Sequence, residues 1–323
     1  MKLPRMSTLI LGLSLLLTAC PDQTKPAPPA NPTIVSVSPA NGATGVTADA
    51  KIVITFSQPM DQAATEAAYQ SSDLLAANAT FNWDVSSKVL TIKPRAPLEY
   101  AKGTTVSTAP KAYVFTLTGA AKDKTGTALA PLASSFTTLR DITATLLSEY
   151  QGTGWVVSDL RPAVFGLPIY VGDSVDNLGI RAFVSFNLPE VSSSLSVSNL
   201  VQATLDVVTA GQSGSLSYLT GEGSTSVTLN VDHVFFGESL SSKAYNAQLF
   251  ANSTTLELPA IQIGPHLRAN VLAAVRDDLA AFSAQGGRSQ FRFGFVKETG
   301  NVGVADQIWF GSPLALVLEY QIP

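Results

Sequence analysis

Apolar and polar residues alternate with a period of two through most of the chain from residue 34 onward. Residues 201–208 read Val-Gln-Ala-Thr-Leu-Asp-Val-Val, and residues 290–296 place three phenylalanines on one face. This alternation is typical of β-strands. Between 182 and 187 both faces carry apolar side chains, which predicts a strand with partners on both sides. Strands are predicted at 34–37, 51–56, 80–83, 88–92, 113–117, 135–138, 143–147, 155–157, 169–171, 182–187, 201–208, 227–231, 290–296, 308–310 and 314–320.

One helical pattern interrupts the strands of the second half. Leu267, Val271, Val275 and Leu279 recur at intervals of four, and the pattern continues to Phe282. Pro265 precedes it and Gly286-Gly287 follows it, which predicts a helix opening near His266. In the first half, Asp61 precedes an alanine-rich stretch and can cap a short helix. Because strands follow strands, we predict an all-β chain of two sandwiches, the second an antiparallel jelly roll with one short packed helix.

The first nineteen residues have the pattern of a signal peptide. Lys2 and Arg5 form a positive segment, 9–17 is a short apolar run, and Leu17-Thr18-Ala19-Cys20 closes it. The apolar run is too short to span a bilayer stably. Leu-Thr-Ala-Cys resembles the lipobox of bacterial lipoproteins, which implies cleavage before Cys20 and lipidation of its sulfur. The alternative is an ordinary signal peptide with a coincidental cysteine.

Residues 20–32 form a proline-rich segment that predicts an extended tether. Lipidation of Cys20 would anchor the exported protein to the bacterial cell envelope, in the outer membrane if one is present. Cleavage leaves 18 basic and 24 acidic residues, a net charge of −6, so nucleic acid is not an expected partner. With one cysteine in the chain, no internal disulfide is expected.

Residues 33–139 resemble the bacterial Ig-like domain. Val37 to Val46 is similar to the opening signature of that family, and Ile54 to Asp61 to its second. Ala121 to Gly126, followed by Ser135 to Thr138, is similar to its closing hairpin. The resemblance implies a β-sandwich that acts as a spacer or adhesion unit.

Residues 140–323 resemble the DNRLRE-type jelly rolls, which are similar to carbohydrate-binding modules of bacterial surface proteins. The resemblance rests on Gly172 to Ser174, Arg181 to Phe186, Phe291 to Phe293 and the closing segment up to Tyr320. The literal DNRLRE hexapeptide is absent, and the loop between Gln212 and Gly223 matches nothing in the family.

No motif for catalysis stands out. The chain has two histidines, His233 at the end of a strand and His266, and no cysteine that could complete a zinc site with them. Gly211-Gln212-Ser213-Gly214 lacks the spacing of a nucleophile elbow. Paired carboxylates for glycoside hydrolysis remain open, because sequence spacing does not exclude them.

Asp173, Asp176 and Asn177 form a compact cluster of oxygen ligands before the strand at 182–187, and Asp306 could complete a calcium shell. The alternative is a turn whose side chains bind their own backbone, with Arg181 paired to one of the carboxylates. A structural calcium ion is the one cofactor that the sequence suggests.

Exposed aromatic rings that stack on sugars are the expected ligand-binding residues. The candidates are Trp155, Tyr170, Tyr218 and Tyr245, with core packing as the alternative for each. Trp309 lies between Ile308 and Phe310, which favours the core. We therefore expect a non-catalytic, lipid-anchored envelope protein whose jelly roll binds a polysaccharide or another surface component. The alternatives are a polysaccharide-degrading enzyme and a purely structural envelope protein.

Overall fold

The computed structural model describes residues 30–190, 192, 195–214, 226–259, 264, 266–298 and 303–323. The predicted signal peptide, Cys20, Tyr218 and Pro265 lie outside these residues. The described chain is almost entirely β-structure around two large hydrophobic cores, one formed by residues 52–136 and the other by residues 142–322. The predicted all-β fold class is confirmed.

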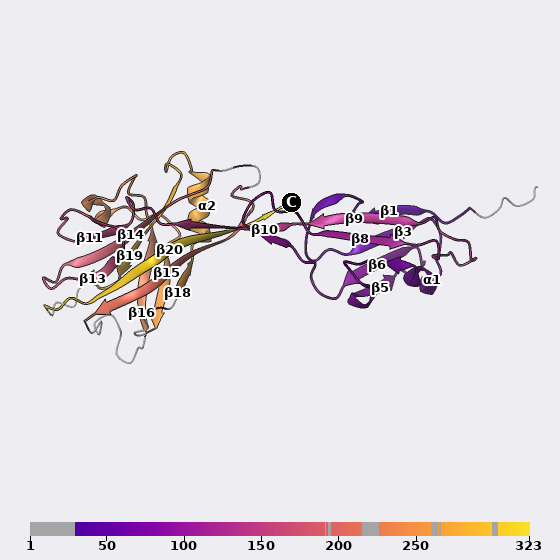
Figure 1. Cartoon of the computed structure of the whole chain (residues 1–323), viewed down its shortest axis with the longest axis horizontal. Helices are drawn as coiled ribbons and strands as arrows, with labels where there is room; N and C mark the ends of the chain where they lie inside the picture. The colour runs from indigo at the N-terminus through magenta and orange to yellow at the C-terminus, as the bar shows by residue number, and fades with distance from the viewer. Residues whose placement is uncertain are drawn as a thin grey trace, which may run out of the picture.

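The first half is a sandwich of two four-stranded sheets (Figure 1). One has the order β1-β3-β6-β5 and the other the order β2-β9-β8-β4. Their facing sides bury Phe56, Leu90, Phe115 and Phe136. The strands of these sheets are β1 (Ile34–Ser38), β2 (Ala43–Val46), β3 (Ile52–Phe56), β4 (Tyr69–Gln70), β5 (Ala79–Trp83), β6 (Val89–Pro94), β8 (Ala112–Leu117) and β9 (Leu132–Thr138). A further strand, β7 (Ala101–Gly103), pairs with the second half.

A short helix, α1 (Gln62–Ala67), follows β3, and a 3-10 turn, η1 (Ala76–Asn78), precedes β5. The Asp61 carboxylate accepts a hydrogen bond from the Ala64 backbone N–H at 3.0 Å. The cap satisfies one of the four amides that lack a helical partner at a helix start. Asp61 is thus the cap that the sequence predicted.

The second half is an antiparallel sandwich of two layers. The first layer has the order β17-β16-β19-β14-β11-β12. In the second layer β18 pairs with β15 and β15 with β20, while β13 and β10 share the other edge of β20. A short pairing of β13 with β14 joins the layers. The strands are β10 (Arg140–Leu147), β11 (Gly154–Val157), β12 (Val164–Phe165), β13 (Ile169–Asp173), β14 (Gly179–Asn187), β15 (Leu200–Ser213), β16 (Ser226–His233), β17 (Thr254–Pro259), β18 (His266–Asn270), β19 (Arg288–Phe295) and β20 (Gln307–Ile322).

Strand β14 lies between two apolar clusters, as its two apolar faces predict. Ala182, Val184 and Phe186 lie in the main core between the layers. On the opposite face, Phe183 contacts a smaller cluster that includes Leu240 and lies beside a 3-10 turn, η2 (Ser242–Asn246). This turn covers the outer side of the first layer.

The predicted helix is shorter than its pattern suggested. Residues His266–Asn270 form strand β18, and the helix α2 spans only Leu272–Ala280. Leu267 and Ala269 are buried while His266 and Arg268 are exposed, so buried and exposed side chains alternate here as in a strand. Pairing with β15 satisfies its backbone groups. His266 therefore begins a strand and not a helix. Strands β12 and β17 were also not predicted.

The two halves share a continuous sheet at their junction. β10 pairs with β20 over eight residue pairs, and its first three residues also pair in parallel with β7 of the first half. Arg140 donates hydrogen bonds to the carbonyl oxygens of Val106 at 2.9 Å and Thr108 at 2.7 Å, and also to the oxygen of Pro323. Figure 1 shows β10 and the end of β20 at the narrow waist of an elongated molecule. The end of the second half is therefore held against the first.

Candidate ligand-binding surface

Three aromatic rings meet on the second half and form what we call the aromatic platform: Trp155, Tyr170 and Trp309. Tyr170 and Trp309 are cross-strand partners, with ring centroids 5.6 Å apart. Trp155 of β11 meets Tyr170 edge to face, with centroids 5.7 Å apart. All three rings are partly exposed. The structure thus brings together two of the four predicted ligand-binding aromatics.

Strand alternation explains why Tyr170 and Trp309 are accessible. Their chain neighbours, among them Val171 and Phe310, lie in the main core. In a strand the intervening side chains must point the other way. Trp309 therefore lies on the outer face of the second layer and is not the core residue that its apolar neighbours suggested. Val164, opposite Trp155 on β12 and 42% exposed, continues the apolar surface.

Trp309 lies directly over the backbone of Gly211, its cross-strand partner on β15. A Cβ atom at Gly211 would lie 2.2 Å from Cζ2 of the indole. Such a distance is far below a van der Waals contact, so the ring position requires glycine there. Sequence reasoning treated Gly211 only as part of a failed nucleophile motif.

Tyr245 has a different environment from the platform. It lies in η2 and is only 5% exposed. The Arg181 guanidinium lies over its ring at 4.2 Å, and its hydroxyl donates to Glu298 Oε2 at 2.6 Å. Burial, and then the hydrogen bond to Glu298, raise the pKa of Tyr245 above its usual value. Its ring face is occupied by Arg181, so it does not contribute to an open ligand surface.

Arg181 does not pair with the predicted loop carboxylates. Its guanidinium binds Glu298, with Nε at 2.6 Å from Oε1, and donates to the Tyr245 carbonyl oxygen. Arg292 of β19 donates to the same carbonyl oxygen at 3.2 Å and pairs with Asp232 at 2.7 Å. These two arginines hold η2 on the first layer.

Asp173 and Asp306 come together as predicted, but as buried residues. Asp173 is fully buried and Asp306 is 2% exposed. The Asp306 backbone N–H donates to Asp173 Oδ1 at 2.9 Å, and the Asp173 N–H donates to the Asp306 carbonyl oxygen at 3.0 Å. This reciprocal pairing fixes the loop before β20 to the end of β13.

Asp176 and Asn177 lie on the exposed turn that follows Asp173. Asn177 has a positive φ of 58°, and its Oδ1 accepts a hydrogen bond from the Gly303 N–H at 3.0 Å. Among the described residues, no three His, Cys, Asp or Glu side chains gather as they would around a metal ion. The calcium site remains a prediction, and the turn has a hydrogen-bonded role of its own.

His233 lies in a buried ionic cluster that the sequence did not reveal. Its Nε2 is 2.8 Å from Asp278 Oδ1, and both side chains are 1% exposed. Ser289 donates to the other Asp278 oxygen at 2.6 Å. Burial opposes protonation of the ring, but the hydrogen bond and charge of Asp278 outweigh it, so the pKa of His233 is raised. Asp278 lies between Ser289 and His233, so the Ser289 hydroxyl bonds to the carboxylate and not to the imidazole, unlike the serine of a catalytic triad.

A second polar group lies on the outer face of the second layer. Asp206 of β15 accepts from His266 Nδ1 at 2.7 Å and from Arg268 Nε at 3.2 Å. The Asp206 side chain is 15% exposed, whereas those of His266 and Arg268 are 50% and 67% exposed. One well-covered carboxylate thus positions an imidazole and a guanidinium that face solvent.

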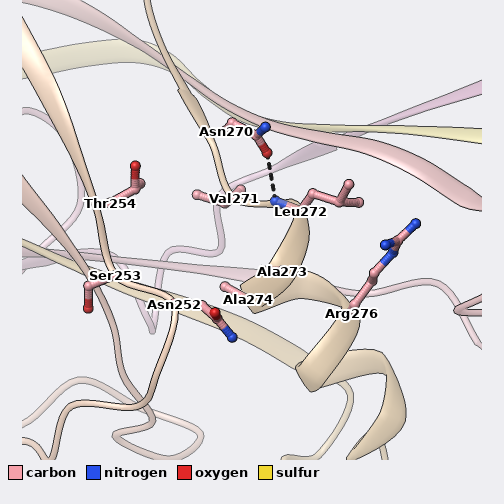
Figure 2. Close-up of a pocket in the computed structure, with 9 residues that line it drawn as sticks. All are labelled: Asn252, Ser253, Thr254, Asn270, Val271, Leu272, Ala273, Ala274 and Arg276. Atoms are coloured by element: carbon pink, nitrogen blue, oxygen red, sulfur yellow. Dashed lines mark hydrogen bonds between the residues drawn. The ribbon is translucent and has the colours of Figure 1, made fainter.

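A hollow of about 450 Å³ opens where α2 begins, and Figure 2 shows the side chains around it. Asn252, Ser253 and Thr254 form one wall, and the first turn of the helix forms the other. Asn270 Oδ1 accepts the N–H of Leu272 at 3.0 Å, so part of the helix start is already capped. Of the predicted site residues that the structure describes, none lines this hollow.

Comparisons with known proteins support the Ig-like assignment of the first half. Residues 29–138 match the family model described as a bacterial Ig-like domain. No curated protein matches the chain. No helix among the described residues has the length and apolar character to cross a bilayer.

Similar solved structures include a transpeptidase and a surface-layer protein, and the similarity to both is distant. An L,D-transpeptidase from Mycobacterium smegmatis is 11% identical, with 72% of this chain and 76% of that chain covered and a TM-score of 0.25. The N-terminal part of the bacterial S-layer protein SbsC is 13% identical, with 72% and 45% covered and a TM-score of 0.24. This chain thus spans less than half of that S-layer fragment. Likeness at this level carries no information about what the chain binds or catalyses.

Proposed function

We propose that the protein is a non-catalytic, lipid-anchored envelope protein whose Ig-like half presents the second sandwich for binding to a polysaccharide. The aromatic platform is the observation that carries this proposal. Exposed aromatic rings can stack on the apolar faces of sugar rings. Trp155, Tyr170 and Trp309 provide such rings and are partly exposed. The absence of a side chain at Gly211 leaves space for the Trp309 indole.

The Ig-like family match supports a place at the bacterial surface, and the Leu17 to Cys20 motif supports anchoring through lipid. Lipid anchoring with more than one acyl chain is stable, because each buried CH₂ contributes about 0.8 kcal/mol. Expression of the full chain with radiolabelled fatty acid tests the anchor. Cys20→Ser should abolish labelling and release the protein from the membrane fraction; unchanged labelling would refute lipidation at Cys20.

Affinity electrophoresis of the mature chain in gels containing soluble polysaccharides tests the binding proposal. Trp309→Ala and Tyr170→Ala should each weaken retardation by at least about fivefold, since stacking on an aromatic ring contributes roughly 1 kcal/mol or more. Tyr150→Ala is the matched control, because this ring is 69% exposed but stacks on Phe165 outside the platform. Absence of retardation by every polymer, or equal loss in the control, would refute the platform.

The same incubations test the non-catalytic part of the proposal. No new reducing ends should appear when the mature chain is kept with any polymer that it binds. Release of oligosaccharides would instead favour the enzyme reading with paired carboxylates.

A further inference from the structure

Residues 249–253 lie against the buried His233 and form what we call the strap. The strap lies between η2 and β17, and all of its residues are exposed. The Phe250 N–H donates to the His233 carbonyl oxygen at 2.8 Å, and the Phe250 ring meets the imidazole edge to face. Asn252 Nδ2 donates to Asp277 Oδ2 at 2.6 Å. Because its side chains are exposed, the position of the strap depends mainly on a few hydrogen bonds.

Both ring nitrogens of His233 face hydrogen-bond acceptors. Nδ1 lies 3.2 Å from the carbonyl oxygen of Ala251 in the strap, and Nε2 lies 2.8 Å from Asp278 Oδ1 on α2. Ser289 donates to the other Asp278 oxygen. A carbonyl oxygen and an ionised carboxylate only accept hydrogen bonds, and a neutral imidazole has a single N–H. Both contacts are therefore satisfied only when the ring is an imidazolium.

The charges around the ring also favour its protonated form. Burial lowers the pKa of His233, but the hydrogen bond and the charge of Asp278 outweigh it, and Asp277 adds to the same effect. The strap contains no ionisable side chain. The charged side chains on the neighbouring strands form ion pairs of their own: Arg292 with Asp232, and Arg288 with Glu149.

Deprotonation of the ring must break one of its two contacts. If the remaining proton stays on Nε2, the hydrogen bond to the buried Asp278 carboxylate is kept. If it stays on Nδ1, the Nε2 lone pair faces that carboxylate and repels it. A hydrogen bond to a charged group is stronger than one to a neutral carbonyl. Nε2 therefore keeps the proton, and the contact with Ala251 is lost.

The strap is also one wall of the hollow beside α2. Asn252 and Ser253, followed by Thr254, lie across this hollow from the first turn of the helix (Figure 2). We propose that His233 is a pH-sensitive latch: its imidazolium joins the strap to α2, and its deprotonation at alkaline pH releases the strap and widens the hollow. The latch is independent of the proposed polysaccharide binding.

Nitrogen NMR of the mature chain labelled with ¹⁵N-histidine tests the protonation state. The chain has two histidines, and His266→Gln assigns their signals. At about pH 6, below the ordinary histidine pKa, both ring nitrogens of His233 should carry protons. In the alkaline range the ring should be protonated at Nε2 alone. A neutral ring at the lower pH, or an alkaline ring protonated at Nδ1, would overturn the proposal.

Amide hydrogen exchange tests the release of the strap. The Phe250 amide is the reporter, because it is hydrogen-bonded while the strap is closed. Its rate, divided by that of an unstructured peptide at the same pH, should rise at least about tenfold as His233 loses its proton, since a hydrogen bond to a charged group is lost. The amides of β14 in the main core should stay protected, because the opening is local. An unchanged ratio, or an equal rise in β14, would refute the latch.

Variants assign the release to His233. His233→Gln should make the exchange ratio of Phe250 independent of pH, whereas the control His266→Gln should keep the rise. Asn252→Ala removes the hydrogen bond to Asp277 and should loosen the strap at every pH without removing the rise. A rise that persists in His233→Gln would contradict the proposal. If that variant does not fold, the two measurements on the wild type still decide.

Discussion

The indole of Trp309 lies so close to Gly211 that a single added methyl group would collide with the ring at 2.2 Å. The glycine is thus as much a part of the aromatic platform as the rings are. It contributes no contact to a ligand, but it determines where the Trp309 indole can lie. Changes at Gly211 should therefore act on binding through Trp309.

Gly211→Ala should displace the indole and weaken polysaccharide binding nearly as much as Trp309→Ala does. The intrinsic tryptophan fluorescence should shift as the ring moves to a new environment. Gly119→Ala is the control, because a Cβ there meets no atom closer than 3.9 Å. If Gly211→Ala binds like the wild type with an unchanged emission maximum, the ring does not depend on this glycine.

The buried pair of His233 and Asp278 should make stability depend on pH. The pKa of His233 is raised in the folded state, so the stabilisation is complete below the ordinary histidine pKa of about 6.5 and is lost as the pH rises through the raised pKa. Urea unfolding at a series of pH values should show a falling free energy of unfolding on the alkaline side.

His233→Gln should remove this part of the pH dependence and cost about 3 kcal/mol or more, because Asp278 is left buried without its charged partner. His266→Gln is the control, since that ring is half exposed. A pH profile of His233→Gln that parallels the wild type would show that this pair does not carry the effect.

Arg140 should connect the two halves. Its guanidinium donates to carbonyl oxygens in the first half and to Pro323 at the end of β20. Arg140→Ala should cost about 2 kcal/mol, as expected for hydrogen bonds to a charged group, and should let the halves reorient. Small-angle scattering tests the second effect: a broader distance distribution is expected, while an unchanged curve would show that strand pairing alone fixes the junction.

Asp173 should stabilise the second half whether or not an ion binds. Asp173→Ala removes the acceptor for the Asp306 N–H in a fully buried position and should cost about 2 kcal/mol. Asp176→Ala, at an exposed turn position, should cost much less.

The predicted calcium ion can be tested on the same variants. Equal thermal midpoints in calcium and in chelator would contradict the calcium prediction and leave the loop with the backbone hydrogen bonds that Asp173 and Asn177 accept. A higher midpoint in calcium that is lost in Asp173→Ala would instead show that the ion binds at this loop.

Local patterns predicted local structure well. The alternation of apolar and polar residues predicted most of the observed strands. Asp61 was predicted to cap a helix, and its carboxylate accepts the N–H of Ala64, three residues later, as an N-cap does. The segment after Pro265 is compatible with a helix and with a strand. Leu267 and Val271 have the four-residue spacing of a helix, while Leu267 and Ala269 have the two-residue spacing of a strand. The segment forms a strand because it pairs with β15. The local sequence does not show that this partner is nearby.

The candidate site depended on contacts between distant residues. Arg181 and Glu298 are 117 residues apart in the sequence, and Asp206 and His266 are 60 residues apart. Neither contact can be predicted from the spacing of neighbouring residues. Trp309 is different. The alternation of Ile308 and Phe310 around it already implied that it faces away from them, and the apolar neighbours concealed this signal.

The parallel pairing of β7 with β10 has a consequence for any attempt to divide the protein. A fragment that begins at Arg140 would lose β7 and expose the backbone edge of β10 at residues 140–142. Uncovered strand edges recruit other chains. Such a fragment is expected to self-associate, and a fragment ending at Leu139 would likewise leave β7 without its partner. Binding measurements on the undivided mature chain avoid both artefacts.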